Sequence, residues 1–234
     1  DYIILDKQPT NLKVINKNDN EKIKESKILD NALIRENFQR NYSHSKLKDC
    51  LDDDLILIND LDEIPNLENF SYQNKITIFK QKMLYFKFNL IYPGISWSGS
   101  KICKKKNFVN PQWLRNIKTR KYPLWRFDIL FSKKKYNKVQ IVENGGWHFT
   151  NIKTPKDIHH KMKKFLHHFE YENSGLDIED IEKLIKEKKP IYNYSVDQRQ
   201  KKWANNVELK KIDLNQLPKY ILNNKEKYKS WLDL

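Results

Sequence analysis

An uninterrupted apolar run, Leu55-Ile56-Leu57-Ile58, constrains the fold more than any other feature of this chain. Four consecutive apolar residues do not alternate between a buried and a solvated face, so the run predicts a strand covered on both faces. Such strands are typical of mostly parallel sheets with helices on both sides. We therefore expect an α/β fold with a mostly parallel, mixed sheet flanked by helices, in which this run is the central strand.

Apolar residues at helical spacing predict the helices, and alternating or short apolar runs predict the other strands. Asp30 is placed to cap the first helix. The expected helices cover residues 31–50, 156–169, 178–188 and 217–234, the last beginning near Pro218. The expected strands are Tyr2–Leu5, Leu12–Ile15 and Met83–Tyr92, the last ended by Pro93-Gly94, with a hairpin of Leu124–Phe131 and Val139–Val142.

The length and composition favour one folded domain. A chain of 234 residues can bury one substantial core, and 12% aromatic residues make it too apolar for a disordered chain although 32% of its residues are charged. No internal repeat or linker divides the sequence. We expect a single domain over residues 1–234.

The basic charge comes mainly from lysine. The formal net charge is +15, and lysines cluster at residues 104–106, 133–135 and 186–189. Such a field attracts polyanions, but nucleic-acid readers usually interleave arginine and exposed aromatic residues with their basic stretches. We expect solvated lysine faces and no specific nucleic-acid partner. A basic nucleic-acid-binding protein or a metal-dependent nuclease remains the alternative.

Cysteine usage and hydropathy indicate a reducing compartment. The two cysteines, Cys50 and Cys103, form no CxxC motif and no zinc-binding spacing with histidine. No apolar run is long enough to span a bilayer, and no signal peptide is recognisable. The sequence therefore predicts no transmembrane segment in this chain and a cytoplasmic location, with a Golgi or membrane-anchored full-length form as the alternative.

The segment Asn59-Asp60-Leu61-Asp62-Glu63-Ile64-Pro65 follows the apolar run directly. Open α/β sheets bind ligands beyond the carboxyl ends of their strands. Asp60 and Asp62 are two residues apart, and in an extended chain their side chains point to the same side. Mn²⁺ or Mg²⁺ held by such carboxylates completes its shell with phosphate oxygens and stabilises a leaving diphosphate. An acidic surface turn is the alternative interpretation.

Three further segments carry groups suited to this chemistry. Gly145-Gly146-Trp147-His148-Phe149 offers a close backbone approach and an imidazole ligand for Mn²⁺. Arg40, in the segment Glu36–Asn41, is suited to a phosphate. His167-His168-Phe169-Glu170 offers acid and base groups near a helix end. Taken singly, each segment is better explained by a structural histidine, an exposed helix arginine or solvated helix-end residues.

In this order, the segments resemble glycosyltransferase family 17, the family of the bisecting β-1,4-mannosyl-glycoprotein N-acetylglucosaminyltransferase. The matching pieces, which run from about residue 30 to the end, are Glu36-x-x-Gln39-Arg40-Asn41, Asp53–Pro65, Trp97-Ser98-Gly99-Ser100, Gly145–Phe149, Lys161 with His167–Glu170, and Leu217–Ile221 with Asn224, Tyr228 and Trp231. The family's opening strand and helix are largely absent, Asn59 stands where the family often has Ser, and the spacing of the Lys161 to Glu170 segment is off by one. The absent opening implies that the domain lacks part of the usual N-terminal strand-helix unit.

The resemblance implies a GT-A-like domain that transfers a sugar with inversion, N-acetylglucosamine being the expected one, from a UDP-sugar donor to a glycan or glycoconjugate acceptor. It implies Asp60, Asp62 and His148 as metal ligands and a carboxylate as the base, for which Glu170, Glu63 and Glu143 are candidates. The donor-binding residues that it implies are Gln39, Arg40, Asp60, Asp62, Trp97, Gly146, Trp147, Lys161, His167 and His168. A catalytically degenerate homologue that only binds sugar is a further alternative.

Overall fold

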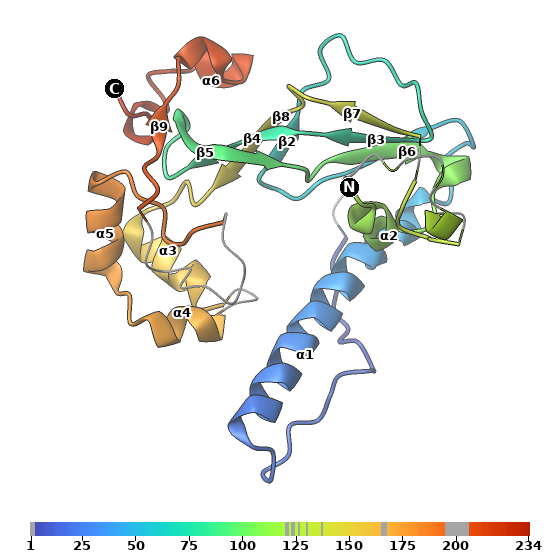
Figure 1. Ribbon diagram of the computed structural model, residues 1–234, viewed down its shortest axis with the longest axis horizontal. Helices are drawn as coiled ribbons and strands as arrows, with labels where there is room; N and C mark the ends of the chain where they lie inside the picture. The colour runs from blue at the N-terminus through green and yellow to red at the C-terminus, as the bar shows by residue number, and fades with distance from the viewer. Residues whose placement is uncertain are drawn as a thin grey trace.

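Two mixed sheets flanked by helices form the computed structural model (Figure 1). It describes residues 3–119, 122, 125, 127–129, 131–136, 138–164, 168–194 and 206–234. The first sheet has the order β1 (Leu55–Ile58), β6 (Lys101–Lys104), β3 (Ile76–Phe79) and β7 (Val139–Val142). The second has the order β2 (Glu63–Pro65), β8 (Gly146–Thr150), β4 (Gln81–Tyr85), β5 (Leu90–Trp97) and β9 (Lys210–Lys211).

The helices lie outside the sheets. They are α1 (Glu21–Tyr42), α2 (Pro111–Asn116), α3 (Pro155–Met162), α4 (His168–Ser174), α5 (Ile178–Lys186) and α6 (Lys219–Asn223). Short 3₁₀ turns cover Ser43–Leu47, Lys105–Asn107, Phe127–Ile129, Leu214–Gln216 and Lys229–Trp231. Within the described residues, no helix is both long enough and apolar enough to cross a membrane.

The predicted α/β class is confirmed, but the mostly parallel sheet and the central strand are wrong. Only the pairs β3 with β7 and β4 with β8 are parallel, and the other described pairs are antiparallel. Strand β1 lies at the edge of its sheet, and Leu55 is 45% exposed. A run of four apolar residues is too short to distinguish a covered strand from an edge strand that buries mainly one residue, here Ile56.

The N-terminal expectations are also corrected. Tyr2 lies outside the described residues, and residues 3–15 form no strand. Helix α1 begins at Glu21, ten residues before the predicted start, and ends at Tyr42, eight residues before the predicted end. The side chain of Asn20 caps the helix by accepting from the Ile23 amide at 2.9 Å. Glu and Lys favour a helix without any apolar period, which explains why periodicity alone missed its first turns. Asp30 lies inside the helix.

The predicted strand Met83–Tyr92 is divided between β4 and β5 by a turn at residues 86–89, and β5 runs through Pro93-Gly94, where the sequence predicts an end. Strand β9 pairs only with Leu90 and Ile91, so Pro93 lies beyond that pairing, where a missing amide donor costs nothing. Strand β7 exists but pairs in parallel with β3 instead of forming a hairpin with residues 124–131. Of those residues, 127–129 form a 3₁₀ turn, and 124, 126 and 130 lie outside the described residues.

Two predicted helices are shorter than expected, and one is confirmed. The segment 156–169 contains α3, which ends at Met162, and the start of α4 at His168. Helix α5 matches its prediction closely, because its apolar stripe and its capping box at Asp177 agree. The C-terminal segment holds only the five-residue α6 followed by a 3₁₀ turn.

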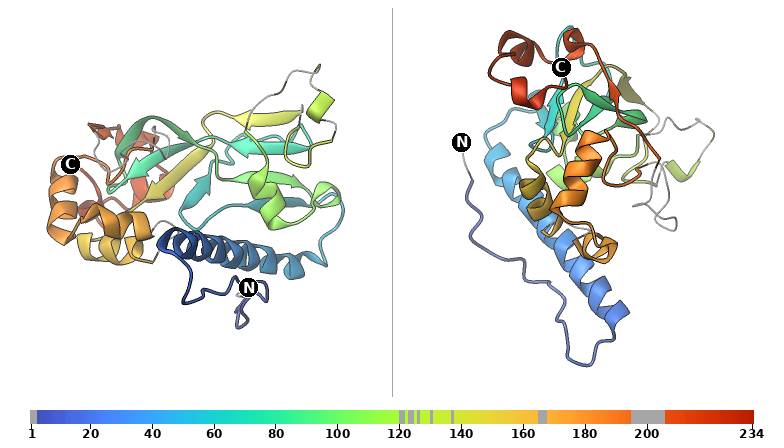
Figure 2. Two further views of the ribbon diagram at one scale, coloured as in Figure 1. Left: turned by 60° about the horizontal axis from the view of Figure 1, so that its bottom comes forward. Right: turned by 90° about the vertical axis from the view of Figure 1, so that its left-hand side faces the viewer.

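The two faces of the second sheet are covered by different parts of the chain. Met83 packs in a core with Ile158 of α3 and Ile181 of α5. Its neighbour Leu84 packs on the other face with Ile221 of α6 and with Leu232. Figures 1 and 2 show α3 to α5 on one side of this sheet and α6 on the other. Adjacent residues on these strands therefore face opposite sides of the sheet and pack in different cores.

Candidate functional site

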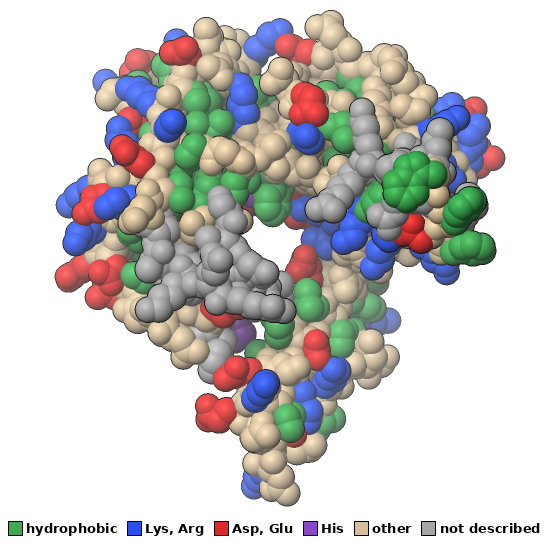
Figure 3. Space-filling model, in the orientation of Figure 1, with side chains coloured by type: hydrophobic (Ala, Val, Ile, Leu, Met, Phe, Trp, Pro, Cys, Tyr) green, Lys and Arg blue, Asp and Glu red, His purple; other side chains and the backbone are tan. Residues whose placement is uncertain are grey.

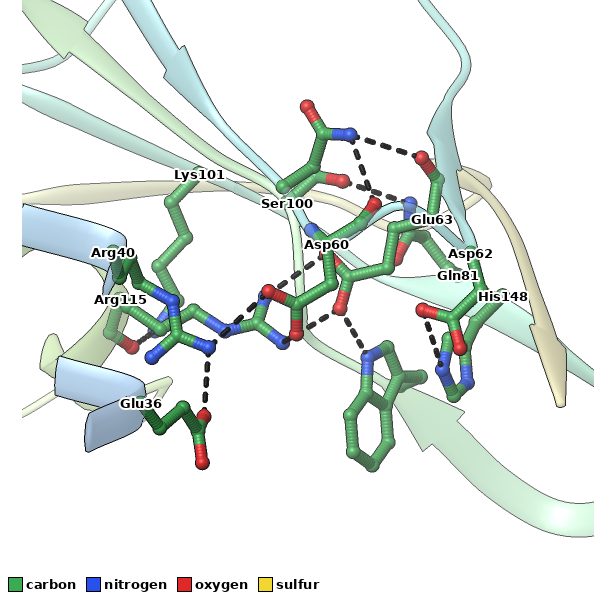
Figure 4. A network of polar contacts seen from close by, with 12 residues as sticks. Glu36, Arg40, Asp60, Asp62, Glu63, Gln81, Ser100, Lys101, Arg115 and His148 are labelled. Atoms are coloured by element: carbon green, nitrogen blue, oxygen red, sulfur yellow. Dashed lines mark hydrogen bonds and ion pairs between the residues drawn. The ribbon is translucent and has the colours of Figure 1, made fainter. Parts of the chain in front are cut away.

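The acidic segment forms a tight turn between β1 and β2. The Glu63 amide donates to the Asp60 carbonyl at 3.0 Å, and the Asn59 side-chain amide donates to the carbonyls of Asp60 and Glu63, each at 3.1 Å. The chain is bent at this point and not extended, so the basis for placing Asp60 and Asp62 on one side does not hold. Figure 4 shows the two carboxylates directed to different partners.

Asp60 contacts two arginines. Arg115 of α2 donates to one carboxylate oxygen at 2.5 Å, and Arg40 of α1 lies 3.3 Å from the other. Arg40 also donates to Glu36 at 2.8 Å and to Gln112 at 2.5 Å. Because charge-assisted bonds of this kind are strong and directional, the turn and the two helices are held together.

The Glu63 side chain is completely buried and saturated with donors. Arg115 binds both of its oxygens, at 2.7 and 2.9 Å, while Trp97 Nε1 and the Asp60 amide donate to it at 2.7 and 3.0 Å. A Cβ atom on Gly99 would lie 1.8 Å from Glu63 Oε1, so only glycine fits there. We call Asp60 and Glu63, with their arginines, the closed side of the turn.

Asp62 and His148 form the open side. Asp62 Oδ1 lies 3.6 Å from His148 Nε2, which is longer than a hydrogen bond, and the Asp62 side chain is 40% exposed. The His148 ring stacks on Trp97 at 4.4 Å, and its Nδ1 is 3.1 Å from the Thr150 hydroxyl. The Phe149 amide donates to the Asp62 carbonyl at 2.8 Å. These contacts fix the imidazole and leave Nε2 facing the carboxylate.

The charges around Asp62 favour its ionised form. Burial raises the pKa of Asp62, but its contact with His148 and the charge of Lys161 outweigh that effect, so the pKa lies below its ordinary value. Burial lowers the pKa of Lys161, although Asp62 opposes this shift. Lys161 Nζ donates to the Asn151 side chain at 3.2 Å. Asp62 is thus an ionised, partly exposed acid between two basic side chains.

Gln39, Arg40 and Asp60 line a shared cavity of about 380 Å³ between α1 and the end of β1. The structure therefore brings the predicted residues of α1 to the acidic turn, next to a hollow.

The remaining predicted residues lie in other surroundings. Gly146 and Trp147 lie on β8 beside His148, but the Trp147 side chain belongs to the opposite face of the sheet, with the core of α6. Glu143 is exposed, with an ion pair to Lys80 at 3.2 Å. Glu170 and His168 lie on α4 and are half-buried. His167 lies outside the described residues.

Sequence reasoning missed Arg115, which binds Asp60 and Glu63. It also missed Thr150, which contacts His148. Arg115 lies on a six-residue helix with no motif around it, and only the fold brings it to the acidic turn. Thr150 had a weak signal, because it lies two residues after His148 on a strand and so shares its face.

In the part of the chain that the structure describes, no group of three or more His, Cys, Asp and Glu side chains is placed to hold a metal ion. Comparison with protein-family models, curated proteins and solved structures gives no match for this chain.

Proposed function

We propose that this protein is a metal-dependent, inverting glycosyltransferase that moves a sugar, N-acetylglucosamine being the first choice, from a UDP-sugar to a glycan hydroxyl. The observation that carries the proposal is the open side of the turn: an ionised carboxylate faces an imidazole whose other nitrogen is held by Thr150. The motif resemblance supplies the reaction class and the choice of UDP.

Asp62 and His148 fit a divalent cation. A carboxylate oxygen and a neutral imidazole nitrogen are suitable ligands for Mn²⁺, and a second hydrogen bond that orients the imidazole is typical of metal sites. Asp60 fits only if Arg40 and Arg115 release it, because both of its oxygens have guanidinium partners. A bound cation would supply positive charge against the leaving diphosphate.

The chain's own cations would share that work. Arg40 and Arg115 lie at Asp60, and Lys161 lies close enough to Asp62 to act on its charge. A diphosphate placed against this turn would lie near the positive charge of two guanidinium groups on one side and of an ammonium on the other. While Arg40 and Arg115 keep their contacts with Asp60, these groups are fixed before binding, so their charge would act on the leaving diphosphate without reorganisation.

The acceptor hydroxyl needs a carboxylate to take its proton. Glu63 has a donor on each oxygen and no exposed side-chain surface, so it is suited to positioning Arg115. Glu143 and Glu170 remain the candidates, and Glu170 is preferred because α4 belongs to the helices on the His148 side of the sheet.

A nucleic-acid function has less support. On the face drawn in Figure 3, basic and acidic side chains are intermixed and do not form one basic patch. Exposed lysines of this kind give phosphate contacts without base readout.

Calorimetry of UDP binding tests the proposal. We expect measurable binding with Mn²⁺ and much weaker binding with EDTA. Asp62→Asn should abolish the Mn²⁺ effect. The control Asp53→Asn removes the same charge from an exposed residue, paired with Lys104 and Lys106, outside the turn, and should leave the effect unchanged. Equal UDP affinity with Mn²⁺ and with EDTA would refute the metal-bridged donor site. Binding without any sugar transfer would favour the degenerate homologue.

A further inference from the structure

A second cavity lies on the face of the second sheet opposite to His148. It measures about 660 Å³ and lies between the β2 and β8 strands and the segment that leads into α6. Lys82 and Trp147, which are paired across β4 and β8, form part of its wall, with the amide side chains of Asn66, Asn144, Asn215 and Gln216. The volume is in the range of small-molecule sites.

The wall of this cavity is fixed by hydrogen bonds. Trp147 Nε1 donates to the Gln216 carbonyl at 2.7 Å, and Lys82 Nζ donates to the Gln216 side chain at 2.8 Å. The Asn66 amide donates to the Gly145 carbonyl at 2.9 Å, which joins the other edge to β8. The indole is therefore held in one orientation as a preformed surface.

The charged groups of the cavity already have partners. Lys219 forms an ion pair with Glu68, and Lys82 donates to Gln216, while burial lowers the pKa of Lys82. In contrast, the side chains of Asn144 and Asn215 are exposed and make no hydrogen bond to any described residue. The groups free to bind a ligand are thus mainly amides, each of which can both donate and accept.

We propose that this cavity binds a neutral saccharide. A sugar ring presents apolar C–H groups on one face, which suit the Trp147 indole, and hydroxyls at its rim, which both donate and accept and so suit the free amides. An anionic ligand would be expected to find unpaired cations, and both lysines of the cavity are already engaged.

This site is separate from the acidic turn. Trp147 and His148 are adjacent on β8, and adjacent strand residues project to opposite faces. The site uses neither Asp62 nor a cation, so saccharide binding does not rest on the proposed transfer activity. For a transferase, such a site would hold part of a glycan chain away from the reacting sugar.

The experiment is a titration of ¹⁵N-labelled protein with chitotriose, maltotriose and a sulfated trisaccharide, followed by NMR in EDTA without UDP. We expect chitotriose or maltotriose to shift the indole N–H signal of Trp147, assigned with Trp147→Phe, with a Kd on the order of 1 mM. The double variant Asn144→Ala, Asn215→Ala should weaken binding about tenfold, since two ligand hydrogen bonds are lost. Asn18→Ala, at an exposed asparagine of the N-terminal segment, should have no effect.

Several outcomes would overturn the proposal. One is the absence of shifts up to about 10 mM of each neutral probe, because a preformed site of this size should bind a trisaccharide more tightly than that. Another is binding that the double variant leaves unchanged, and a third is preference for the sulfated probe. Because EDTA is present, a failed Mn²⁺–UDP site and a failed saccharide site give separate results.

Discussion

The two sides of the acidic turn use the same residue types for different purposes. On the closed side, Glu63 is fully buried and has donors on both oxygens, and Asp60 is held by two arginines. On the open side, Asp62 is partly exposed and faces His148 across 3.6 Å. Buried, paired acids are costly to disturb, whereas an open ionised acid has oxygens left for a ligand.

The difference teaches that neighbouring carboxylates in one motif need not act together. The closed side joins α1, α2 and the two sheets through Arg40, Arg115 and Trp97. It supplies rigidity to the open side, where exchange with a ligand can occur. Substitutions on the closed side should therefore change stability, and those on the open side should change ligand use.

The largest expected effect comes from Glu63→Gln. It removes the charge that holds Arg115 in a buried position, and breaking one partner of a buried ion pair costs about 3–5 kcal/mol. Urea denaturation should show this loss in the free energy of unfolding. Glu143→Gln, at an exposed residue with a single ion pair, is the control and should change stability by less than about 0.5 kcal/mol. Equal stability of the two variants would contradict the interpretation that the closed side stabilises the fold.

Asp62→Asn is expected to act on function. It preserves shape and removes the charge, so sugar transfer or UDP-sugar hydrolysis at saturating Mn²⁺ should fall about 100-fold. The free energy of unfolding should stay within about 0.5 kcal/mol, because the residue is partly exposed. Full activity in a normally folded variant would sink the assignment of this turn as the metal site.

Lys101 tests how the closed side is supported. It is buried, and its ammonium donates to the carbonyls of Arg115 and Ile117, at the end of α2. Burial and the nearby Arg115 lower its pKa to about 8. Between that pH and the ordinary lysine pKa, the unfolded chain holds a proton that the folded chain loses, so this residue makes stability rise with pH.

Lys101→Met should remove that rise, which is on the order of 2 kcal/mol between about pH 8 and 10. The measurement is the free energy of unfolding of both proteins across this range. Their difference isolates Lys101, because buried tyrosines that titrate nearby contribute equally to both proteins. Lys17→Met, at an exposed lysine, should retain the rise. A parallel pH profile for the wild-type protein and Lys101→Met would contradict the assignment.

The smallest expected effect concerns Asp62 in acid. Its folded pKa lies below its unfolded value near 3.9, so its contribution to stability is present above that value and is lost as the pH falls through the folded pKa. Exposure screens the effect, so wild-type protein and Asp62→Asn should converge by less than about 0.5 kcal/mol between pH 5 and 3. Divergence on acidification would show that the folded pKa is raised.

Local patterns predicted the elements that depend on local sequence. Helix α5 follows from its apolar stripe and its cap, and β1 followed by an acidic turn follows from Leu55 to Pro65. The contacts of the turn depend on distant partners. Arg115 lies 52 residues from Glu63, and nothing around it distinguishes it from other surface arginines.

Neither the pairing of neighbouring strands nor their place in the sheet could be predicted from short apolar runs. Strand β1 pairs with β6, which lies more than 40 residues later, and a four-residue apolar run is compatible with an edge or a centre. The same limit applies to Trp147 and His148: the motif placed both in one site, but the strand period places them on opposite faces. Knowing that this segment is a strand would have separated them.

Gly146 controls which side of the molecule each of these two residues serves. Its backbone has φ of +122°, and a Cβ atom there would lie 2.1 Å from the Ile64 carbonyl. A slip of β8 that moved Trp147 into this position would turn Trp147 and His148 each to the opposite face, and the close approach of the β2 backbone forbids it. The opposite slip would move Asn144 to the position of Gly145, where a Cβ atom would lie 2.8 Å from the Lys80 amide nitrogen. A residue without a side chain thus fixes the register of β8, and the placement of both proposed sites depends on it.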